Sequence, residues 1–371
     1  MNEAKRKNRN RSRRRNGLLD VINAFLTLVV LGLIVVAGVV LLGSQRFYSK
    51  GPVVEDRVFL VQRGASLSTI AQRLEAEGLV ADRWTFQFGA MAQRKQAAIR
   101  AGEYNITANS SMADILKEIT EGRPISYAVT IPEGYTSWQV VERINAAPNL
   151  VGEITEIPPE GSLLPDTYSF ERGANRQDII EQMTGALEKQ LAEIWDNRAD
   201  DLPISTPEEL LILASIVEKE TGLAAERPKV AGVFINRLNR GMRLQSDPTI
   251  IYGITNGEGT LGRGLRRSEI DASTPYNTYQ IDGLPIGPIA NPGVESLRAV
   301  ANPEVTDALY FVADGTGGHA FANTYAEHQA NVARWRQIER EQAQAAAEAE
   351  DEADAEAARD ELEAQQAPAT Q

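Results

Sequence analysis

The chain has 371 residues, a hydrophobic fraction of 43%, a formal net charge of −13 and no cysteine. This length allows two or three domains, and the lack of cysteine excludes disulfides, thiolate metal sites and cysteine nucleophiles. The acidic balance argues against nucleic acid as a partner. Because the only histidines are His319 and His328 and no HExxH motif occurs, we expect neither a catalytic zinc site nor a cofactor.

The N-terminal region has the pattern of a membrane anchor. Residues 1–17 carry eight Lys or Arg and one Glu, and the 22 residues Val21–Leu42 carry no charge. As a helix this run is about 33 Å long, enough to cross a bilayer. A cleaved signal peptide is the alternative, but the run is long and no A-x-A site follows it. The basic arm places the N-terminus in the cytoplasm, so we expect a single-pass protein of a bacterial inner membrane with its catalytic part in the periplasm.

After the anchor, one pattern occurs three times: a strand, a Gly or polar turn, a Ser or Thr cap and an amphipathic helix. The copies begin near Val61, Tyr104 and Ile131. The first copy, VQRGASLSTIAQRL, resembles a LysM module, which would bind glycan. Ordinary α+β packing is the alternative, because strand, turn and capped helix are a common combination.

The stretch LLILASIVEKETG (Leu210–Gly222) predicts a short buried helix. Thr206 has the form of a helix cap, Gly222 suits a positive φ at the end, and the last turn carries Glu218 and Glu220. A carboxylate held against apolar surroundings has a raised pKa and is a candidate general acid for glycoside cleavage. Periodicity alone does not choose between the two residues, and a simple ion pair at the helix end is the alternative for either.

Together these patterns predict an α+β protein with a disordered basic arm at the N-terminus and, at the C-terminus, a solvated acidic tail that is disordered or a frayed helix. The predicted parts are a basic cytoplasmic arm (1–17), a transmembrane helix (18–43), a linker (44–57), a LysM-like βα subdomain (58–126), a second βα module with a connector (127–200), a catalytic α+β domain (201–336) and an acidic low-complexity tail (337–371).

Several long segments then occur in the order found in the endolytic murein transglycosylase (MltG, YceG-like) family. The chain resembles that family from the membrane span through about Asn323, most clearly in ASIVEKETG, VFINRL, MRLQSDPT, YNTY, GLPIGPIANPG and YFVADGTGGHAF. The resemblance implies an enzyme that cuts nascent peptidoglycan strands without water, leaves 1,6-anhydroMurNAc ends and so limits strand elongation. It implies Glu218 as the general acid and then base, and peptidoglycan synthases (penicillin-binding proteins) as partners.

An intramolecular attack by the MurNAc 6-hydroxyl needs no second carboxylate, because the nucleophile is already held on the substrate. We therefore expect Glu220 to be structural and paired with a cation. The candidates for contacting the sugar are eight loop residues: Gln245, Ser246, Asp247, Tyr252, Tyr276, Asn277, Tyr279 and His319. Turn capping, loop hydrogen bonds and core packing are the alternative roles for them. A non-catalytic peptidoglycan-binding scaffold for wall synthases and a hydrolase remain alternative functions.

Overall fold

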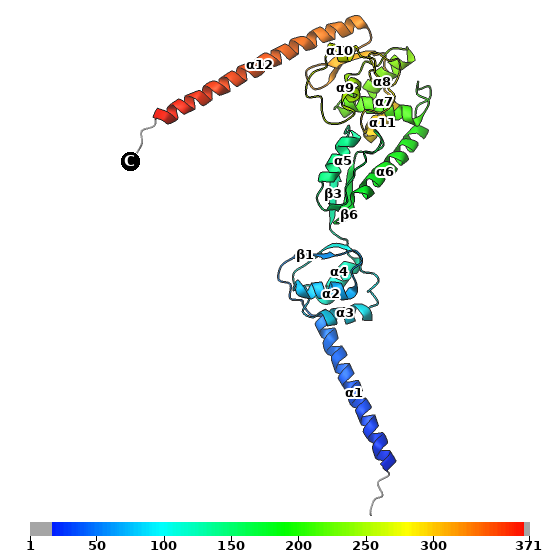
Figure 1. Ribbon diagram of the computed structural model, residues 1–371, viewed down its shortest axis with the longest axis vertical. Coiled ribbons are helices and arrows are strands. Elements are labelled where there is room, and N and C mark those ends of the chain that lie inside the picture. Colours follow the sequence, from blue (N-terminus) through cyan, green and yellow to red (C-terminus); the bar gives the residue numbers. More distant parts are fainter. Residues whose placement is uncertain (1–16, 367–371) are drawn as a thin grey trace, which may run out of the picture. The chain divides into compact units, whose positions relative to one another are not determined.

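The computed structural model describes residues 17–366, in which helices and short strands are mixed (Figure 1). This mixture agrees with the predicted α+β class. The chain divides into two compact units, Met1–Ser126 and Tyr127–Gln371. Strands in the described part of the chain pair only two by two: β1 with β2, β3 with β5, β4 with β6, and β7 with β8. The predicted basic arm lies outside the described residues, apart from Gly17.

The first helix, α1 (Gly17–Tyr48), is long and apolar, and its large apolar side chains from Leu19 to Leu42 are exposed. Its most apolar window has a mean hydropathy of 3.1, and none of that window is buried. By length and composition the helix is able to cross a membrane, which is compatible with the predicted anchor. The helix continues five residues past the predicted end at residue 43, so the predicted linker is helical up to Tyr48.

The rest of the first unit is a strand pair covered by helices. In chain order its elements are β1 (Arg57–Val61), α2 (Leu67–Ala76), α3 (Arg83–Ala92), β2 (Gly102–Ile106) and α4 (Met112–Glu121). The strands are antiparallel, with Phe59 opposite Tyr104, and both rings are completely buried. Ser66 caps α2 and Ser111 caps α4, so the predicted order of strand, turn, cap and helix is confirmed for both segments.

The second unit begins with a further strand and helix. Its first elements are β3 (Ser126–Thr130), α5 (Ser137–Ala146), β4 (Leu150–Val151), β5 (Thr167–Glu171), β6 (Ala174–Asn175) and α6 (Arg176–Asp196). Thr136 and Gln139 form a capping box at the start of α5, as the repeated pattern predicts for a cap at this position. The core of this part contains Val140, Ile144, Tyr168 and Ile179, and α6 passes from it into the helical part of the unit.

The remaining elements surround one buried helix, α7. They are α7 (Pro207–Glu220), the 3-10 turn η1 (Ala224–Glu226), α8 (Arg227–Asn239), α9 (Asp247–Thr255), α10 (Arg267–Ile270), α11 (Val294–Ala301), β7 (Tyr310–Ala313), β8 (His319–Ala322) and α12 (Tyr325–Gln366). Helix α7 contacts α6, α8, α9 and α11. Thr206 caps it by accepting a hydrogen bond from the amide of Glu209, as predicted.

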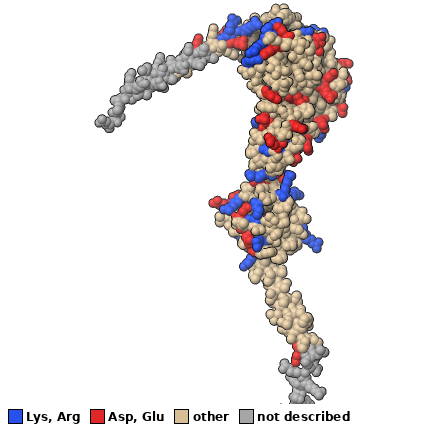
Figure 2. Space-filling view, in the orientation of Figure 1, with Lys and Arg blue, Asp and Glu red and all other residues tan. Residues whose placement is uncertain are grey.

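One prediction at a helix end is wrong. Gly222 does not have a positive φ, and α7 ends instead with Thr221 in an extended conformation. The acidic tail continues α12 as far as Gln366 (Figure 1), which is the helical form considered for it from sequence. Alanine, glutamate and glutamine all favour helix, so this sequence extends a helix that begins at Tyr325 even without an apolar stripe to pack it. In Figure 2, acidic side chains are spread over the visible face of the second unit, and basic ones gather where α12 begins.

Candidate active site

Helix α7 carries two carboxylates in its last turn. Residues 210–217 are all buried, including Ser215, whose hydroxyl donates to the carbonyl of Ile212. Glu218 and Glu220 follow directly. Because residues two apart on an α-helix project about 200° apart, the two side chains point into different surroundings, and those surroundings decide which of them is available for chemistry.

Glu218 is held in a closed set of contacts. Its Oε1 accepts from Arg227 Nη2 at 3.1 Å, and its Oε2 accepts from the amide of Gly293 at 3.0 Å and the hydroxyl of Ser296 at 2.7 Å. Only 5% of the side chain is exposed. Gly293 is the N-cap of α11, where a negative charge is stabilised by the free amides and the helix dipole. In this structure Glu218 therefore ties α7 to α8 and α11, and both of its oxygens are occupied.

Glu220 opens into a cleft of about 320 Å³. The cleft is lined by Glu220, Gly222, Ala313, Gly315, Gly317, Gly318, His319, Trp335 and Gln342. Burial raises the pKa of Glu220; the nearby Ser246 hydroxyl opposes this rise, Asp247 adds to it, and His319 and Arg237 oppose it weakly. Among the described residues no ion pair is formed by Glu220, so the expectation that it pairs with a cation is not met. A buried carboxyl group with a raised pKa beside a cleft is suited to donating a proton.

The turn before α9 lies beside Glu220. Ser246 is buried, and its Oγ has no hydrogen-bond partner of good geometry within residues 17–366 although it lies close enough to lower the pKa of Glu220. Asp247 is exposed and accepts a 2.6 Å hydrogen bond from the hydroxyl of Tyr279, whose pKa is raised by burial and by that carboxylate. Gln245 has φ +48°, an uncommon left-handed conformation for a residue other than glycine. The structure thus brings four of the predicted residues to one place.

His319 completes the cleft from the other side. Its Nδ1 lies 2.7 Å from Oε2 of Glu226, and its amide donates to Oε1 of the same carboxylate at 3.0 Å. Glu226 is the last residue of η1, so a turn between α7 and α8 fixes the ring of a residue at the start of β8. An acceptor at Nδ1 sets which ring nitrogen carries the proton and leaves Nε2 free to act.

The other predicted residues lie elsewhere. The ring of Tyr252 packs against that of Tyr276, with centroids 4.8 Å apart. Burial raises the pKa of Tyr252, and Glu160, which is itself buried and has a raised pKa, adds to this rise. Asn277 is completely buried and donates to three backbone carbonyls in residues 269–272. Asn277 therefore has the loop hydrogen bonds that were the alternative to substrate binding. Tyr252 and Tyr276 have the core packing that was the alternative for them.

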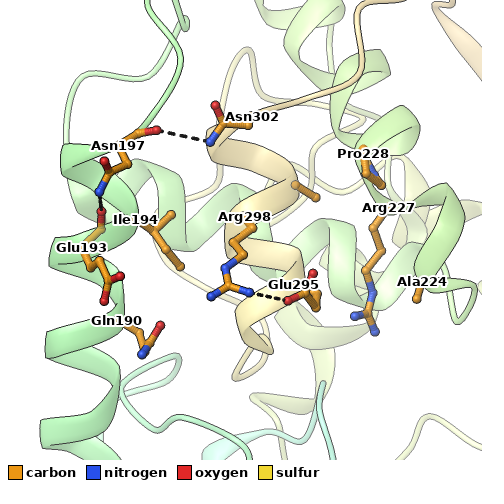
Figure 3. A pocket seen from close by; sticks show the side chains of 11 residues that line it. Gln190, Glu193, Ile194, Asn197, Ala224, Arg227, Pro228, Glu295, Arg298 and Asn302 are labelled. Carbon is orange, nitrogen blue, oxygen red and sulfur yellow. Dashed lines mark hydrogen bonds and ion pairs between the residues drawn. The ribbon is translucent and has the colours of Figure 1, made fainter.

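A larger cavity of about 610 Å³ lies elsewhere in the second unit (Figure 3). It is lined by residues of α6, η1, α8 and α11, among them Glu193, Glu295, Arg298 and Arg227. Glu295 is paired with Arg298 at 2.8 Å, and Glu193 is exposed to solvent. Neither acid is desolvated, so this cavity lacks the buried proton donor that Glu220 gives to the smaller cleft.

The sequence profile of the YceG-like family matches residues 59–334, about three quarters of the chain. The chain belongs to the YceG-like family. The match spans both units from β1 into α12, so it includes Glu218, Glu220 and His319, whereas Trp335 and Gln342 at the edge of the cleft follow it. Within residues 17–366 no group of three or more His, Asp or Glu residues is arranged to hold a metal ion.

Relatives in the YceG-like family are named for one activity. A protein of Streptococcus pneumoniae serotype 2, named endolytic murein transglycosylase, is 31% identical over 74% of this chain, and the chain spans 57% of the length of that relative. One of Bacillus subtilis with the same name is 28% identical over 80% of this chain and 91% of its own length. A crystal structure described as yceG-like, from Listeria monocytogenes, covers 74% of this chain and 98% of its own, with 28% identity and a TM-score of 0.46.

Sequence reasoning missed several residues of this YceG-like site. Glu226, Arg227 and Ser296 carry no recognisable motif, and their partners are 93, 9 and 78 positions away in the chain. One signal was present for Glu226: a chain with a single histidine in a glycine-rich loop needs an acceptor to orient that ring. Nothing in the sequence showed which of the many acidic residues supplies it.

Proposed function

We propose that this protein is a lytic transglycosylase that cleaves the β-1,4 bond between MurNAc and GlcNAc within peptidoglycan strands, with Glu220 as its acid and base. The observation that carries the proposal is the carboxyl group of Glu220, which is desolvated, has a raised pKa and faces a cleft. The relatives named endolytic murein transglycosylase support the choice of substrate. Glu220 takes the roles that the family resemblance implied for Glu218, because Glu218 is occupied by three donors.

In the proposed reaction Glu220 first donates a proton and then accepts one. Glu220 donates its proton to the glycosidic oxygen while the bond between that oxygen and C1 of MurNAc breaks, and the GlcNAc hydroxyl leaves. The 6-hydroxyl of the same MurNAc attacks C1, and the Glu220 carboxylate accepts the proton that the hydroxyl releases. The products are a GlcNAc end and a 1,6-anhydroMurNAc end, with no water consumed. The attacking hydroxyl is held on the substrate, so it has the high effective concentration of an intramolecular nucleophile.

Ser246, Asp247 and His319 are placed to assist these steps. The Ser246 hydroxyl beside Glu220 has an unused hydrogen-bonding capacity. We assign to Asp247 the stabilisation of positive charge that develops at C1, because it is an exposed carboxylate at the edge of the site. His319 lines the cleft with its ring fixed by Glu226, which suits it to orienting a sugar hydroxyl.

Asp247 also favours a second candidate function. An inverting glycosidase uses a second carboxylate to activate water, and Asp247 is a second carboxylate near Glu220. In that reading the protein is a hydrolase that leaves reducing ends. The two reactions differ by one water in the mass of the new end, so mass analysis of the products separates them.

The rest of the chain fits an enzyme held at a membrane. We propose that α1 spans the inner membrane with the N-terminus in the cytoplasm, because the residues before it are strongly basic. Residues 58–126 then hold glycan as a LysM-like module, and both units work in the periplasm on strands emerging from wall synthases. By cutting such strands the enzyme limits their elongation.

The decisive experiment compares isosteric variants of one helix. Purified full-length protein in detergent is incubated with uncrosslinked glycan strands, and the new ends are identified by mass. We expect Glu220→Gln to abolish anhydro ends, Glu218→Gln to retain part of the activity of the folded protein, and Glu208→Gln, an exposed change in the first turn of α7, to match the wild type. Full activity of Glu220→Gln contradicts the proposal, and hydrated ends favour the hydrolase.

A non-catalytic scaffold for wall synthases remains the alternative of a different class. It predicts that wild-type protein is retained on glycan strands but releases no new ends of either kind. The same incubation tests it, with retention on insoluble peptidoglycan measured in parallel.

A further inference from the structure

Helix α3 of the first unit carries an exposed apolar stripe. Trp84, Phe88 and Met91 are 54%, 64% and 46% exposed, and their spacing of four and three residues places them on one face. Phe86 and Ala90, two positions away from members of the stripe, are completely buried. Residues two apart on a helix point about 200° apart. The stripe therefore lies on the side of α3 that faces away from the core of the unit.

This helix packs against the end of α1. A Cβ atom built on Gly89 of α3 meets the ring of Phe47, in the last turn of α1, at 2.1 Å, so the two helices are in close contact there. Figure 1 shows α3 at the end of the first unit from which α1 emerges. Tyr48, the last residue of α1, is 63% exposed, and its hydroxyl accepts a 3.4 Å hydrogen bond from Gln93 just after α3. The stripe is thus continuous with the exposed surface of an apolar helix.

The position of this contact along α1 indicates the depth of α3 relative to a bilayer. The apolar run of α1 ends at Leu42, and Phe47 is five residues further on, about 7.5 Å along the axis. A bilayer has a hydrocarbon core about 30 Å thick, or about 40–45 Å with its headgroups, so each headgroup layer is roughly 5–7 Å thick. If α1 spans the membrane, α3 lies at the level of the headgroups. Tryptophan and tyrosine are enriched at that level.

The positively charged side chains next to the stripe also suit a position at the level of the lipid headgroups. The guanidinium of Arg83 lies 5.1 Å from the centre of the Trp84 ring, and Arg46 is in the last turn of α1. Arg94 follows the C-terminal end of α3 and is exposed. Helices that lie in a membrane interface combine an apolar face with flanking lysine or arginine that binds lipid phosphate.

We propose that α3 is an interfacial membrane helix, with Trp84, Phe88 and Met91 inserted into the leaflet from which α1 emerges. The occupant of this face is the lipid bilayer itself. The inference rests on the proposed membrane anchoring by α1, and it adds that the first unit has a fixed orientation on the membrane and does not swing on a flexible tether.

The test measures contact between Trp84 and lipid in the full-length protein. The protein is reconstituted into nanodiscs of phosphatidylethanolamine and phosphatidylglycerol, with lipid brominated near the headgroup end of the acyl chains as the quencher. The reporter variant keeps Trp84 and has Phe in place of Trp138, Trp195 and Trp335. We expect brominated lipid to reduce its emission at least twofold. The matched control is Trp84→Phe with Val58→Trp in the same background, because Val58 is 53% exposed on β1; its emission should not change.

The proposal is overturned if brominated lipid leaves the emission of the Trp84 reporter as unchanged as that of the Val58→Trp control. A protein partner bound to this face instead of lipid also overturns it. If the reporter variant does not fold, the difference in quenching between the wild type and Trp84→Phe gives the same answer.

Phe88→Asp is a second probe: it should leave the fold intact, because the position is exposed, and reduce the quenching of Trp84. Failure of the chain to enter nanodiscs overturns the anchor and this inference together, whereas entry without quenching overturns this inference alone. Glycan cleavage is measured separately and does not depend on either result.

Discussion

Arg227 Nη2 lies 3.1 Å from Oε1 of Glu218, and both side chains are almost completely buried. The same nitrogen also reaches Oε2 of Glu133 at 2.8 Å. One guanidinium therefore connects α8, the end of α7 and the segment before α5. This connection holds the end of α7, where Glu218 is buried in contacts and Glu220 lines the cleft.

The first prediction concerns stability. Glu218→Gln removes the charge that compensates Arg227, and breaking a buried pair typically costs about 3–5 kcal/mol. Because Glu133 remains as a partner, we expect the low end of that range. Denaturant unfolding followed by circular dichroism measures the change. Glu295→Gln, which breaks the exposed pair with Arg298, is the matched control and should cost less than about 1 kcal/mol. Unchanged stability together with complete loss of anhydro ends would return the acid role to Glu218.

The second prediction concerns pH. A general acid works only while protonated, and burial holds the pKa of Glu220 above the ordinary value of 4.5. We therefore expect the rate on glycan strands to stay high above pH 4.5 and to decline as pH rises through the raised pKa. Rates of cleavage measured across pH at saturating substrate test this. A rate that already declines at the pH of an ordinary glutamate would be inconsistent with the assignment.

The same shift has a consequence for folding, with a definite sign. Between 4.5 and the raised pKa, folded protein holds a proton on Glu220 that unfolded protein has lost, so stability falls as pH rises through this window. Glu220→Gln removes the titrating group. We expect its free energy of unfolding relative to the wild type to increase from pH 4.5 upward, by an amount that levels off above the raised pKa. A difference that is constant with pH would show that burial does not shift this group.

Much of the scaffold could be predicted from local sequence. The cap at Thr206, the buried run 210–217 and the capped helices after Ser66 and Ser111 all depend on neighbouring residues, and all are present. The tail is helical because its helix-forming composition outweighs the lack of an apolar stripe.

The different surroundings of Glu218 and Glu220 could not be predicted from local sequence. Helical periodicity places them on different sides, but only the positions of Gly293 and Ser296, more than 70 residues later, make one side closed. The other side, which carries Glu220, meets Ser246 and His319 from two further segments of the chain. The residue types of the loops can be recognised in the sequence, but their grouping into one cleft depends on contacts between segments far apart in the chain.

The third prediction concerns the pair of Glu226 and His319. Glu226→Gln keeps the shape but replaces a charged acceptor, and hydrogen bonds to charged groups contribute about 1.5–3 kcal/mol. If this hydrogen-bond free energy is lost from the transition state, kcat falls roughly 10- to 100-fold while KM changes little. A merely structural role would not move the pH profile, so we also expect Glu226→Gln to shift the profile of kcat. Glu226→Asp should recover part of the rate. A change confined to stability would contradict a positioning role.

The fourth prediction concerns Gln245, whose φ of +48° strains the backbone beside Ser246. A left-handed conformation costs a residue with a Cβ about 1–2 kcal/mol, and glycine avoids that cost but loses about 0.5–1 kcal/mol through its freer unfolded chain. Gln245→Gly should therefore gain up to roughly 1 kcal/mol of stability. If the exposed amide of Gln245 binds sugar, the same variant raises KM for glycan strands.

The matched control for Gln245→Gly is Asn256→Gly. Asn256 also has a positive φ, +50°, but it lies at the C-cap of α9, whereas Gln245 is next to Ser246 at the start of that helix. Because asparagine tolerates this conformation better than glutamine, its replacement should gain less stability and leave cleavage unchanged. Strain kept at a binding position is commonly offset by function. A Gln245→Gly protein that is more stable and equally active would show that the strain at this turn serves the fold of the loop and not the substrate.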